Sequence, residues 1–191
     1  DSTQGLLDAI AATGGTVITS TSSYGTVRAE IPVTKAVELA DRSGVDRIVP
    51  ADEATTNQAD PVDAIASSVG AGANEADVTH GAATARATYG VDGTGVKACV
   101  LSDGVDTLAN RVASGDLPPD VDVLTDQAGS GDEGTAMLEL IHDIAPGADL
   151  GFATGFTGAE NMAQNLSLIH ISEPTRPLYI SYAVFCLKKL L

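Results

Sequence analysis

Cysteine and basic side chains are both scarce in this 191-residue chain, and each scarcity excludes a class of protein. Of the two cysteines, Cys186 lies in an unusual C-terminal tail and Cys99 lies alone inside an apolar run. A lone buried thiol usually serves packing, so no disulfide framework is indicated. Only 10 basic side chains oppose 26 acidic ones, which gives a net charge of −16 and disfavours nucleic acid and anionic membranes as partners.

The C-terminal tail, residues 166–191, does not read like natural protein sequence. Translated back into codons, residues 166–176 and 180–187 resemble two parts of a transposase-type sequencing adapter. A membrane-spanning helix would need about 20 apolar residues, and charged residues and prolines interrupt this tail. We therefore expect the natural sequence to end near Asn165, and we exclude the tail from reasoning about the fold.

Without the tail, the chain is still more acidic. The tail holds one of the acidic and three of the basic side chains, so residues 1–165 keep 25 acidic and 7 basic ones, a net charge of −18. Such a charge favours solubility, and an acidic secreted or salt-adapted surface explains it most simply. The chain begins at Asp1 without a methionine or a signal peptide, so we expect a fragment at both ends.

The first 50 residues predict a small α+β unit. Its expected order is helix, strand, strand, helix, strand, over residues 6–12, 16–19, 26–31, 33–42 and 45–49. In the second helix, Val37, Leu39 and Ala40 are expected to face inward. The order corresponds to a ferredoxin-like α/β plait that lacks its first strand. Residues 51–80 are rich in small and polar residues without a sustained period, which predicts a linker.

A block in the middle of the chain predicts a parallel α/β sheet with flanking helices. An apolar strand over residues 96–101 stops at Ser102-Asp103-Gly104, a helix opens at residues 131–137, and a second apolar strand follows at residues 150–154. A glycine-rich turn at residues 90–95 precedes the first strand. It is therefore not a dinucleotide-binding fingerprint, in which the glycines follow the strand.

Two carboxylates in this block are candidate functional residues. Asp103 follows the carboxyl end of a buried strand, the edge at which α/β sheets hold ligands and chemistry. Glu133 opens the helix and starts a row completed by Met137, Leu140 and Ile144, which predicts the buried face. Simpler roles are an Asx turn for Asp103, and for Glu133 a first-turn acid matched to the helix dipole, with Asp132 as the N-cap.

The order and wording of this block resemble the first half of a subtilisin-like (subtilase) catalytic domain. In that family an Asp closes the first core strand, a His-Gly-Thr helix follows, and an Ala-Pro-x-Ala turn leads to the next strand. Here Glu133-Gly134-Thr135 and Ala145-Pro146-Gly147-Ala148 occupy the last two places. The resemblance implies a pro-domain-like unit at 1–50, a linker containing the maturation cut at 51–80, the N-terminal half of the catalytic domain at 81–165, and a non-native tail at 166–191.

By this resemblance, Asp103 and Glu133 form the catalytic acid/base pair, with Glu133 in the place of the histidine. In the family the usual order is Asp-Thr/Ser-Gly, whereas here it is Ser102-Asp103-Gly104, so the acid lies one residue closer to the glycine. A shift of one residue along a strand turns a side chain to the opposite face. Either the strand is one residue longer here, or the acid makes different interactions from those in the family. His142 is expected to face away from Glu133, and His80 has no identifiable partner.

A glutamate base is similar to that of the sedolisins, the serine-carboxyl peptidases of the same fold. Their helix carries an Asp four residues after the Glu, but Met137 stands at that position here, so their pair is not reproduced. An unperturbed glutamate has a pKa of about 4.3, so we expect the parent enzyme to prefer acidic conditions.

The resemblance implies a serine-type endopeptidase precursor that acts on polypeptides without a cofactor and works outside the cell or in the cell envelope, and no residue is assigned to a metal. No serine in residues 1–165 has the Gly-Thr-Ser-x-x-x-Pro context of the nucleophile, so we expect this chain by itself to be inactive. Two alternatives stay open. One is a non-catalytic binding or scaffold domain of the same fold. The other is a flavodoxin-like or receiver-like domain with a divalent ion at Asp103 and Asp106.

Overall fold

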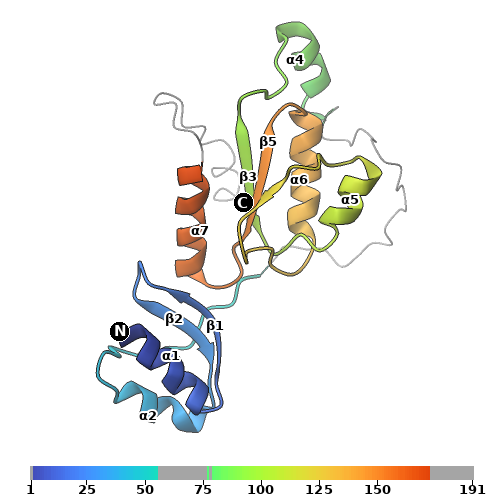
Figure 1. The fold of residues 1–191 in the computed structure, drawn as a ribbon. Coiled ribbons are helices and arrows are strands. Elements are labelled where there is room, and N and C mark those ends of the chain that lie inside the picture. Colours follow the sequence, from blue (N-terminus) through green and yellow to red (C-terminus); the bar gives the residue numbers. More distant parts are fainter. Residues whose placement is uncertain (1, 56–76, 78, 173–191) are drawn as a thin grey trace. The chain divides into compact units, whose positions relative to one another are not determined.

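The computed structural model describes residues 2–55, 77 and 79–172, which form two compact units (Figure 1). The first unit comprises residues 1–54 and 155–164, and the second comprises residues 55–154 and those from 165 onwards. Most of the expected linker (56–76 and 78) and the tail from residue 173 lie outside the described residues.

Residues 2–40 of the first unit form two helices, a 3-10 turn and a two-stranded antiparallel sheet. These elements are α1 (Ser2–Ala12), β1 (Thr16–Thr21), β2 (Thr26–Glu30), the 3-10 turn η1 (Val33–Lys35) and α2 (Ala36–Ala40). The expected hairpin is confirmed, with Thr16 opposite Glu30 and Thr21 opposite Thr26. Ala9, Ile10 and Leu39 make a small buried core.

Two expectations for this unit are wrong. Val37 is 71% exposed and Ala40 is exposed as well, so of the three residues expected to face inward only Leu39 does. Residues 45–49 form no strand, and Ile48 and Val49 lie exposed. Their β-branched pattern suits a strand, but strand formation also needs a neighbouring edge for pairing, which local sequence does not specify.

The second unit is built on a three-stranded parallel sheet in the order β3-β5-β4. β3 (Lys97–Ser102) pairs with β5 (Asp149–Thr154) along its whole length, so that Ser102 lies beside Thr154, and β4 (Asp122–Val123) pairs with the other edge of β5. Both long strands therefore match the expected ones within a residue. The short β4 was not predicted, because two residues give no periodic signal.

The helices after residue 80 are α4 (Ala82–Tyr89), α5 (Leu108–Ser114), α6 (Glu133–Ile144) and α7 (Ala159–Ser172). α6 packs on β3 and β5, whereas α4 lies beyond the amino ends of these strands (Figure 1). α6 confirms the helix expected from residue 131 onwards, whereas α5 was not predicted. α6 ends where Pro146 follows Ala145, because proline disfavours helical backbone in the residue before it. The chain is thus a mixed α/β protein with a parallel sheet.

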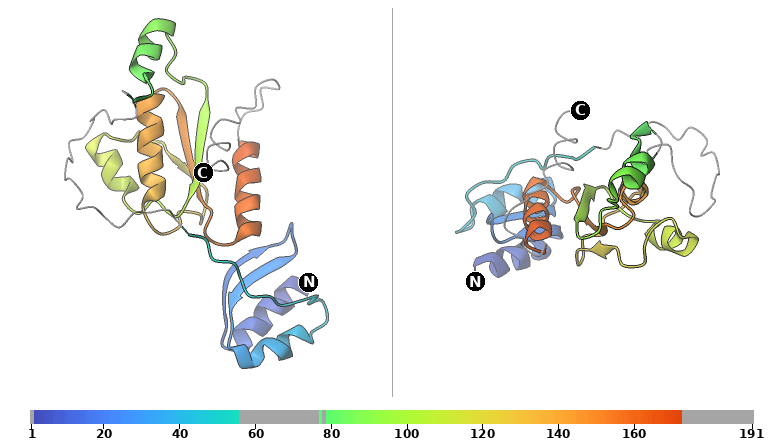
Figure 2. Two further views of the ribbon diagram at one scale, coloured as in Figure 1. Left: turned by 180° about the vertical axis from the view of Figure 1, so that it is seen from behind. Right: turned by 90° about the horizontal axis from the view of Figure 1, so that it is seen from above.

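The two faces of the sheet bury separate clusters. Val100 and Phe152 pack with Leu138 of α6 on one face, while Cys99, Leu101 and Ala153 pack with Ile169 of α7 on the other. Alternate residues of each strand therefore serve opposite faces. Figures 1 and 2 show α6 and the C-terminal part of α7, which belongs to this unit from residue 165 onwards, on the two sides of the strands. Ile169 belongs to the segment that we interpret as adapter-derived, and its apolar side chain fits this face whatever its origin.

The buried face of α6 differs from the expected one. Gly134, Thr135 and Leu138 are buried, whereas Leu140 is 43% exposed and Ile144 36%. The face that meets the sheet is therefore displaced from the row that begins at Glu133. This displacement leaves Glu133 half-buried at the flank of the helix. The expectation failed because several apolar rows were available on α6, and packing on β3 and β5 chose among them.

Candidate functional site at the carboxyl edge of the sheet

The candidate site lies where the parallel strands end and α6 begins. β3 ends at Ser102 and β5 ends beside it at Thr154, while α6 begins at Glu133. The chain leaves β3 through residues 103–107 and approaches α6 through residues 127–132. The carboxyl ends of neighbouring parallel strands are the usual place for ligands and chemistry in α/β proteins.

Backbone hydrogen bonds join these two loops. Gly104 and Gly129 form an isolated β-bridge. Further bonds run from the amides of Val105, Ser130 and Asp106 to the carbonyls of Ala128, Asp103 and Gly131, at 3.2, 3.2 and 3.0 Å. Because their main chains are bonded to one another, the loops hold the side chains of this edge in fixed positions.

Asp103 is buried and bonded to main-chain amides. The side chain is 6% exposed, and its Oδ1 accepts hydrogen bonds from the amides of Gly104 (2.6 Å) and Gly134 (3.2 Å). Gly134 lies in the first turn of α6, where amides have no partner within the helix. Asp103 therefore caps α6 from the strand end, with its negative charge at the favourable end of the helix dipole.

Glu133 is bonded to a residue that the sequence did not single out. The Ser102 hydroxyl donates a hydrogen bond of 2.5 Å to Glu133 Oε2. Ser102 is 1% exposed and Glu133 is half-buried. No hydrogen bond joins Asp103 to Glu133 among the described residues, so the two predicted site residues are neighbours with different partners. The alignment on Gly104 was the available signal, because it placed Ser102 on the face of the strand next to Glu133.

Two further carboxylates bind the opposing loop. Asp106 Oδ2 accepts the amide of Gly131 at 2.9 Å, and Asp132 accepts both the amide and the hydroxyl of Thr107, at 3.0 and 2.6 Å. Asp132 is the N-cap residue of α6 as expected, but its side chain makes no capping bond. Burial by itself raises the pKa of Asp132, yet the bonds from Thr107 and the charge of Arg111 outweigh it and hold that pKa below its ordinary value.

Buried amide and hydroxyl groups support the site from the sheet side. Thr154 Oγ1 donates to the carbonyl of Asp103 at 2.9 Å. Asn165, which is 1% exposed, donates through Nδ2 to the carbonyl of Thr154 (2.8 Å) and to Gln127 Oε1 (2.6 Å). These contacts tie the end of β5 to the strand end that holds Ser102 and Asp103. Sequence reasoning gave neither Thr154 nor Asn165 a role.

Nothing in the described part of the chain forms a metal centre. Within residues 2–55, 77 and 79–172, no three histidine, cysteine or acidic side chains are grouped so that they could hold a metal ion. The divalent-ion alternative invoked Asp103 and Asp106, and each of these carboxylates accepts hydrogen bonds from backbone amides. The geometry therefore gives that alternative no support.

The histidines lie apart from Glu133. His142 is nine residues further along α6, which is about 14 Å along the helix axis at 1.5 Å per residue. His142 is therefore too far along α6 to act on Glu133. His80 lies exposed in the turn before α4.

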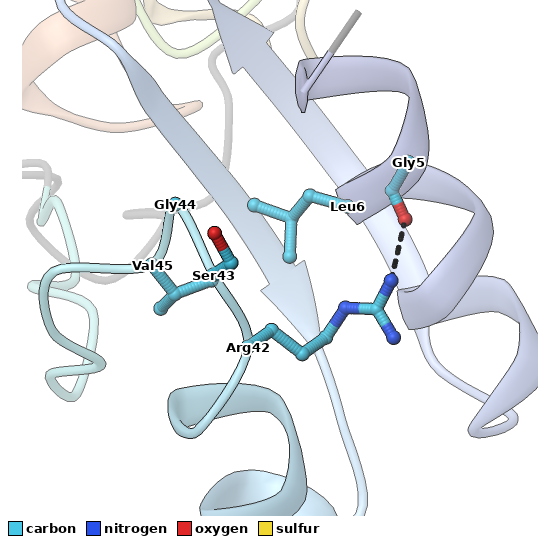
Figure 3. Close-up of a pocket in the computed structure, with 6 residues that line it drawn as sticks. All are labelled: Gly5, Leu6, Arg42, Ser43, Gly44 and Val45. Carbon is cyan, nitrogen blue, oxygen red and sulfur yellow. Dashed lines mark hydrogen bonds between the residues drawn. The ribbon is translucent and has the colours of Figure 1, made fainter.

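A separate pocket lies in the first unit (Figure 3). It is lined by Gly5, Leu6 and residues 42–45, and the Arg42 guanidinium donates to the Gly5 carbonyl at 3.4 Å. Its volume of about 190 Å³ is below the range of roughly 300–1,000 Å³ that is common for small-molecule sites. Its lining contains no acid, histidine or cysteine, so it offers little for catalysis.

Comparisons with known proteins add no family to this description. A scan against protein-family models found no match, and searches of curated proteins and of solved structures found none. None of the helices in the described residues is long and apolar enough to cross a membrane.

Proposed function

We propose that residues 81–165 are the N-terminal half of a subtilisin-like serine endopeptidase domain, preceded by a pro-domain-like unit at residues 1–50. Three features support this proposal: the order strand, acid, helix and strand, the parallel pairing of β3 with β5, and the start of α6 beside the end of β3. The extracellular or cell-envelope location and the polypeptide substrate belong to the same proposal.

The hydrogen bond from Ser102 to Glu133 carries the proposal. It holds a carboxylate at the carboxyl edge of a parallel sheet, in the first turn of a helix whose small residues pack closely on the strands. A general base has to be fixed within hydrogen-bond reach of the proton that it removes. Within the described residues, Glu133 is bonded to a side-chain hydroxyl alone, whereas Asp132 and Asp103 both accept hydrogen bonds from backbone amides.

In the proposed reaction, a serine from a segment outside residues 1–165 attacks the peptide carbonyl. Glu133 accepts the serine proton and later returns it to the leaving amine, and water then hydrolyses the acyl-enzyme. Asp103 holds the first turn of α6 in place through the amide of Gly134. The base is a carboxylic acid of low intrinsic basicity, so the enzyme should work best under acidic conditions.

One observation favours a non-catalytic domain of the same fold as the second candidate. Asp103 is 6% exposed, and its bonds to Gly104 and Gly134 are those of a structural acid. A scaffold or binding domain would keep these bonds with no need for a nucleophile. The segment that would contain the nucleophilic serine distinguishes the two candidates.

The first experiment is to amplify and sequence the source DNA across the codon of Asn165. If the proposal is right, the reading frame continues into a Gly-Thr-Ser-x-x-x-Pro segment. The protein produced from that frame hydrolyses casein at acidic pH, and Glu133→Gln lowers kcat by about 10²- to 10⁴-fold. Asp106→Asn is the matched control, because it removes a carboxylate of the same edge and should leave kcat within a few-fold. A frame that encodes residues 166–191 and then stops, or an extended protein without hydrolysis at any pH, would refute the proposal.

A further inference from the structure

We propose that Ser102 is the positioning residue of Glu133, and that Asp103, the acid expected from the sequence, fixes α6 and does not hold the base. A catalytic role for Ser102 rests on the proposed function. The assignment itself states only that Ser102, and not Asp103, orients the Glu133 side chain. It replaces a pair of carboxylates by a hydroxyl and a carboxylate as the organised group at this edge.

The first argument is which groups donate and which accept the hydrogen bonds around Glu133. An ionised carboxylate can only accept hydrogen bonds, so a partner that orients it has to donate. Ser102 donates its hydroxyl proton to Glu133 Oε2 at 2.5 Å, the short distance expected for a hydroxyl bonded to a charged oxygen. Asp103 is itself an acceptor, and its two bonds come from the amides of Gly104 and Gly134.

The rigidity of Ser102 is the second argument. Ser102 is 1% exposed, and its backbone is paired with Thr154 at the end of a regular ladder. The Thr154 hydroxyl lies 3.3 Å from the Ser102 carbonyl. A serine buried in this way cannot exchange its bond to Glu133 for one to water without unpairing the strand end. Sites placed on strands and helices hold functional groups more accurately than sites on loops.

These contacts give Asp103 and Ser102 separate roles. Asp103 fixes where α6 begins by bonding Gly134, and Ser102 fixes how the side chain of the preceding residue, Glu133, is turned. With Oε2 bonded to Ser102, the remaining oxygen, Oε1, is the atom that would take the proton of a nucleophile. Loss of Asp103 should therefore disturb the helix start, whereas loss of Ser102 should disturb only the direction of the carboxylate.

The test uses the 191-residue chain with isotope-labelled glutamate and leucine, studied by NMR. The readouts are the order parameters of the Glu133 and Leu138 side chains and the Ser102 hydroxyl proton. We expect the wild-type chain to show a slowly exchanging hydroxyl proton and a rigid Glu133 side chain. In Ser102→Ala, the order parameter of Glu133 should fall into the flexible range, below about 0.6, while Leu138 stays rigid. Asp106→Asn, the matched control, should leave Glu133 unchanged.

Two further variants separate the roles of Ser102 and Asp103. Asp103→Asn keeps an acceptor oxygen for the amides and should leave Glu133 ordered. If Ser102→Ala does not fold, Ser102→Cys replaces it: the thiol has a similar shape but donates weakly, so Glu133 should again lose order. The proposal is overturned if Glu133 stays rigid in the folded Ser102 variant. It is also overturned if Asp103→Asn loosens Glu133 more than the Ser102 variant does, or if Leu138 loosens together with Glu133.

These outcomes are independent of the proposed function. Should the extended protein prove inactive, the peptidase proposal fails, while the NMR result still decides which residue holds Glu133. Should it be active, Ser102→Ala ought to lower kcat about 10- to 100-fold with KM unchanged, because a misdirected base weakens the transition state and not substrate binding. An unchanged kcat in an active protein would remove Ser102 from the mechanism.

Discussion

The two edges of the parallel sheet are organised differently. At the carboxyl edge, Ser102, Asp103 and Thr154 are buried, and the loops are joined through carboxylates that accept amide hydrogen bonds. At the amino edge, Lys97 forms an ion pair of 2.7 Å with Asp122, which is 52% exposed. One edge thus buries its polar groups in a network, whereas the other leaves an ion pair open to water.

The two ends of α6 repeat this contrast. Asp103 accepts an amide of the first turn, and at the other end Arg86 Nη1 donates to the carbonyls of Asp143 and Ile144, both at 2.9 Å, and to Asp77 at 2.7 Å. Each charge has the sign that the helix dipole favours. The carboxyl edge holds Glu133 in addition to the groups that the helix end requires. Burying part of the Glu133 carboxylate costs free energy, and the helix end does not need it as a cap. This difference distinguishes a candidate site from a structural helix cap.

The largest change in unfolding free energy should come from adding a methyl group at the tightly packed carboxyl edge. In Gly134→Ala, the new methyl group would overlap the Gly104 carbonyl and the Phe152 ring. Overpacking of this kind should cost about 3 kcal/mol of unfolding free energy, measured by urea titration. Ala136→Gly, at an exposed position of α6, is the control and should cost only about 1 kcal/mol through helix propensity. Helix propensity alone predicts a gain of about 1 kcal/mol for Gly134→Ala, so an unchanged or increased unfolding free energy in that variant would contradict close packing at this edge.

The next effect concerns the amino edge. Arg86→Ala removes the guanidinium from the last carbonyls of α6 and leaves the buried Asp77 without its ion-pair partner. We expect a loss of about 2 kcal/mol in urea unfolding, since breaking a buried pair leaves an uncompensated charge. The double variant Arg86→Ala/Asp77→Asn should recover part of this loss. If it recovers nothing, the bonds to the α6 carbonyls dominate over the ion pair.

A smaller effect is expected at Asp132, and it should depend on pH. Asp132→Asn exchanges an acceptor of the Thr107 bonds for an amide and should cost about 1 kcal/mol at pH 7. The folded pKa lies below the ordinary value of 3.8, so this stabilisation is present above that value and is lost as the pH falls through the folded pKa. Unfolding measured from pH 7 down to pH 2 should show the two proteins converging. A constant difference over this range would contradict the assignment.

The smallest change in unfolding free energy should come from removing the solvent-exposed ion pair between Lys97 and Asp122. The hydrogen bond to Asp122 raises the pKa of Lys97, but Asp122 is largely exposed, so solvent screens the pair. Lys97→Met should change the unfolding free energy by no more than about 0.5 kcal/mol, and the difference should shrink in 1 M salt. An effect as large as that of Arg86→Ala would mean that the Lys97–Asp122 pair is not screened by solvent.

Local sequence predicted the elements whose pattern is long and regular. The strands that became β3 and β5 and the helix α6 with its proline stop lie within a residue or two of the expected positions. α5, β4 and the irregular course of residues 45–49 were missed or mistaken. A seven-residue helix and a two-residue strand carry little periodic signal, and a strand-like run forms a strand only where an edge accepts it.

The sequence alone determined that Asp103 follows a buried strand and that Glu133 opens a helix, because apolar periodicity and turn residues are local properties. Only the tertiary structure decided the partners: Asp103 bonds the amides of Gly104 and Gly134, and Ser102 bonds Glu133. The face that each side chain presents depends on the register of β3 against β5 and on how α6 packs, and a shift of one residue exchanges those faces. Contacts between residues thirty positions apart are fixed by this packing and not by the residues nearby.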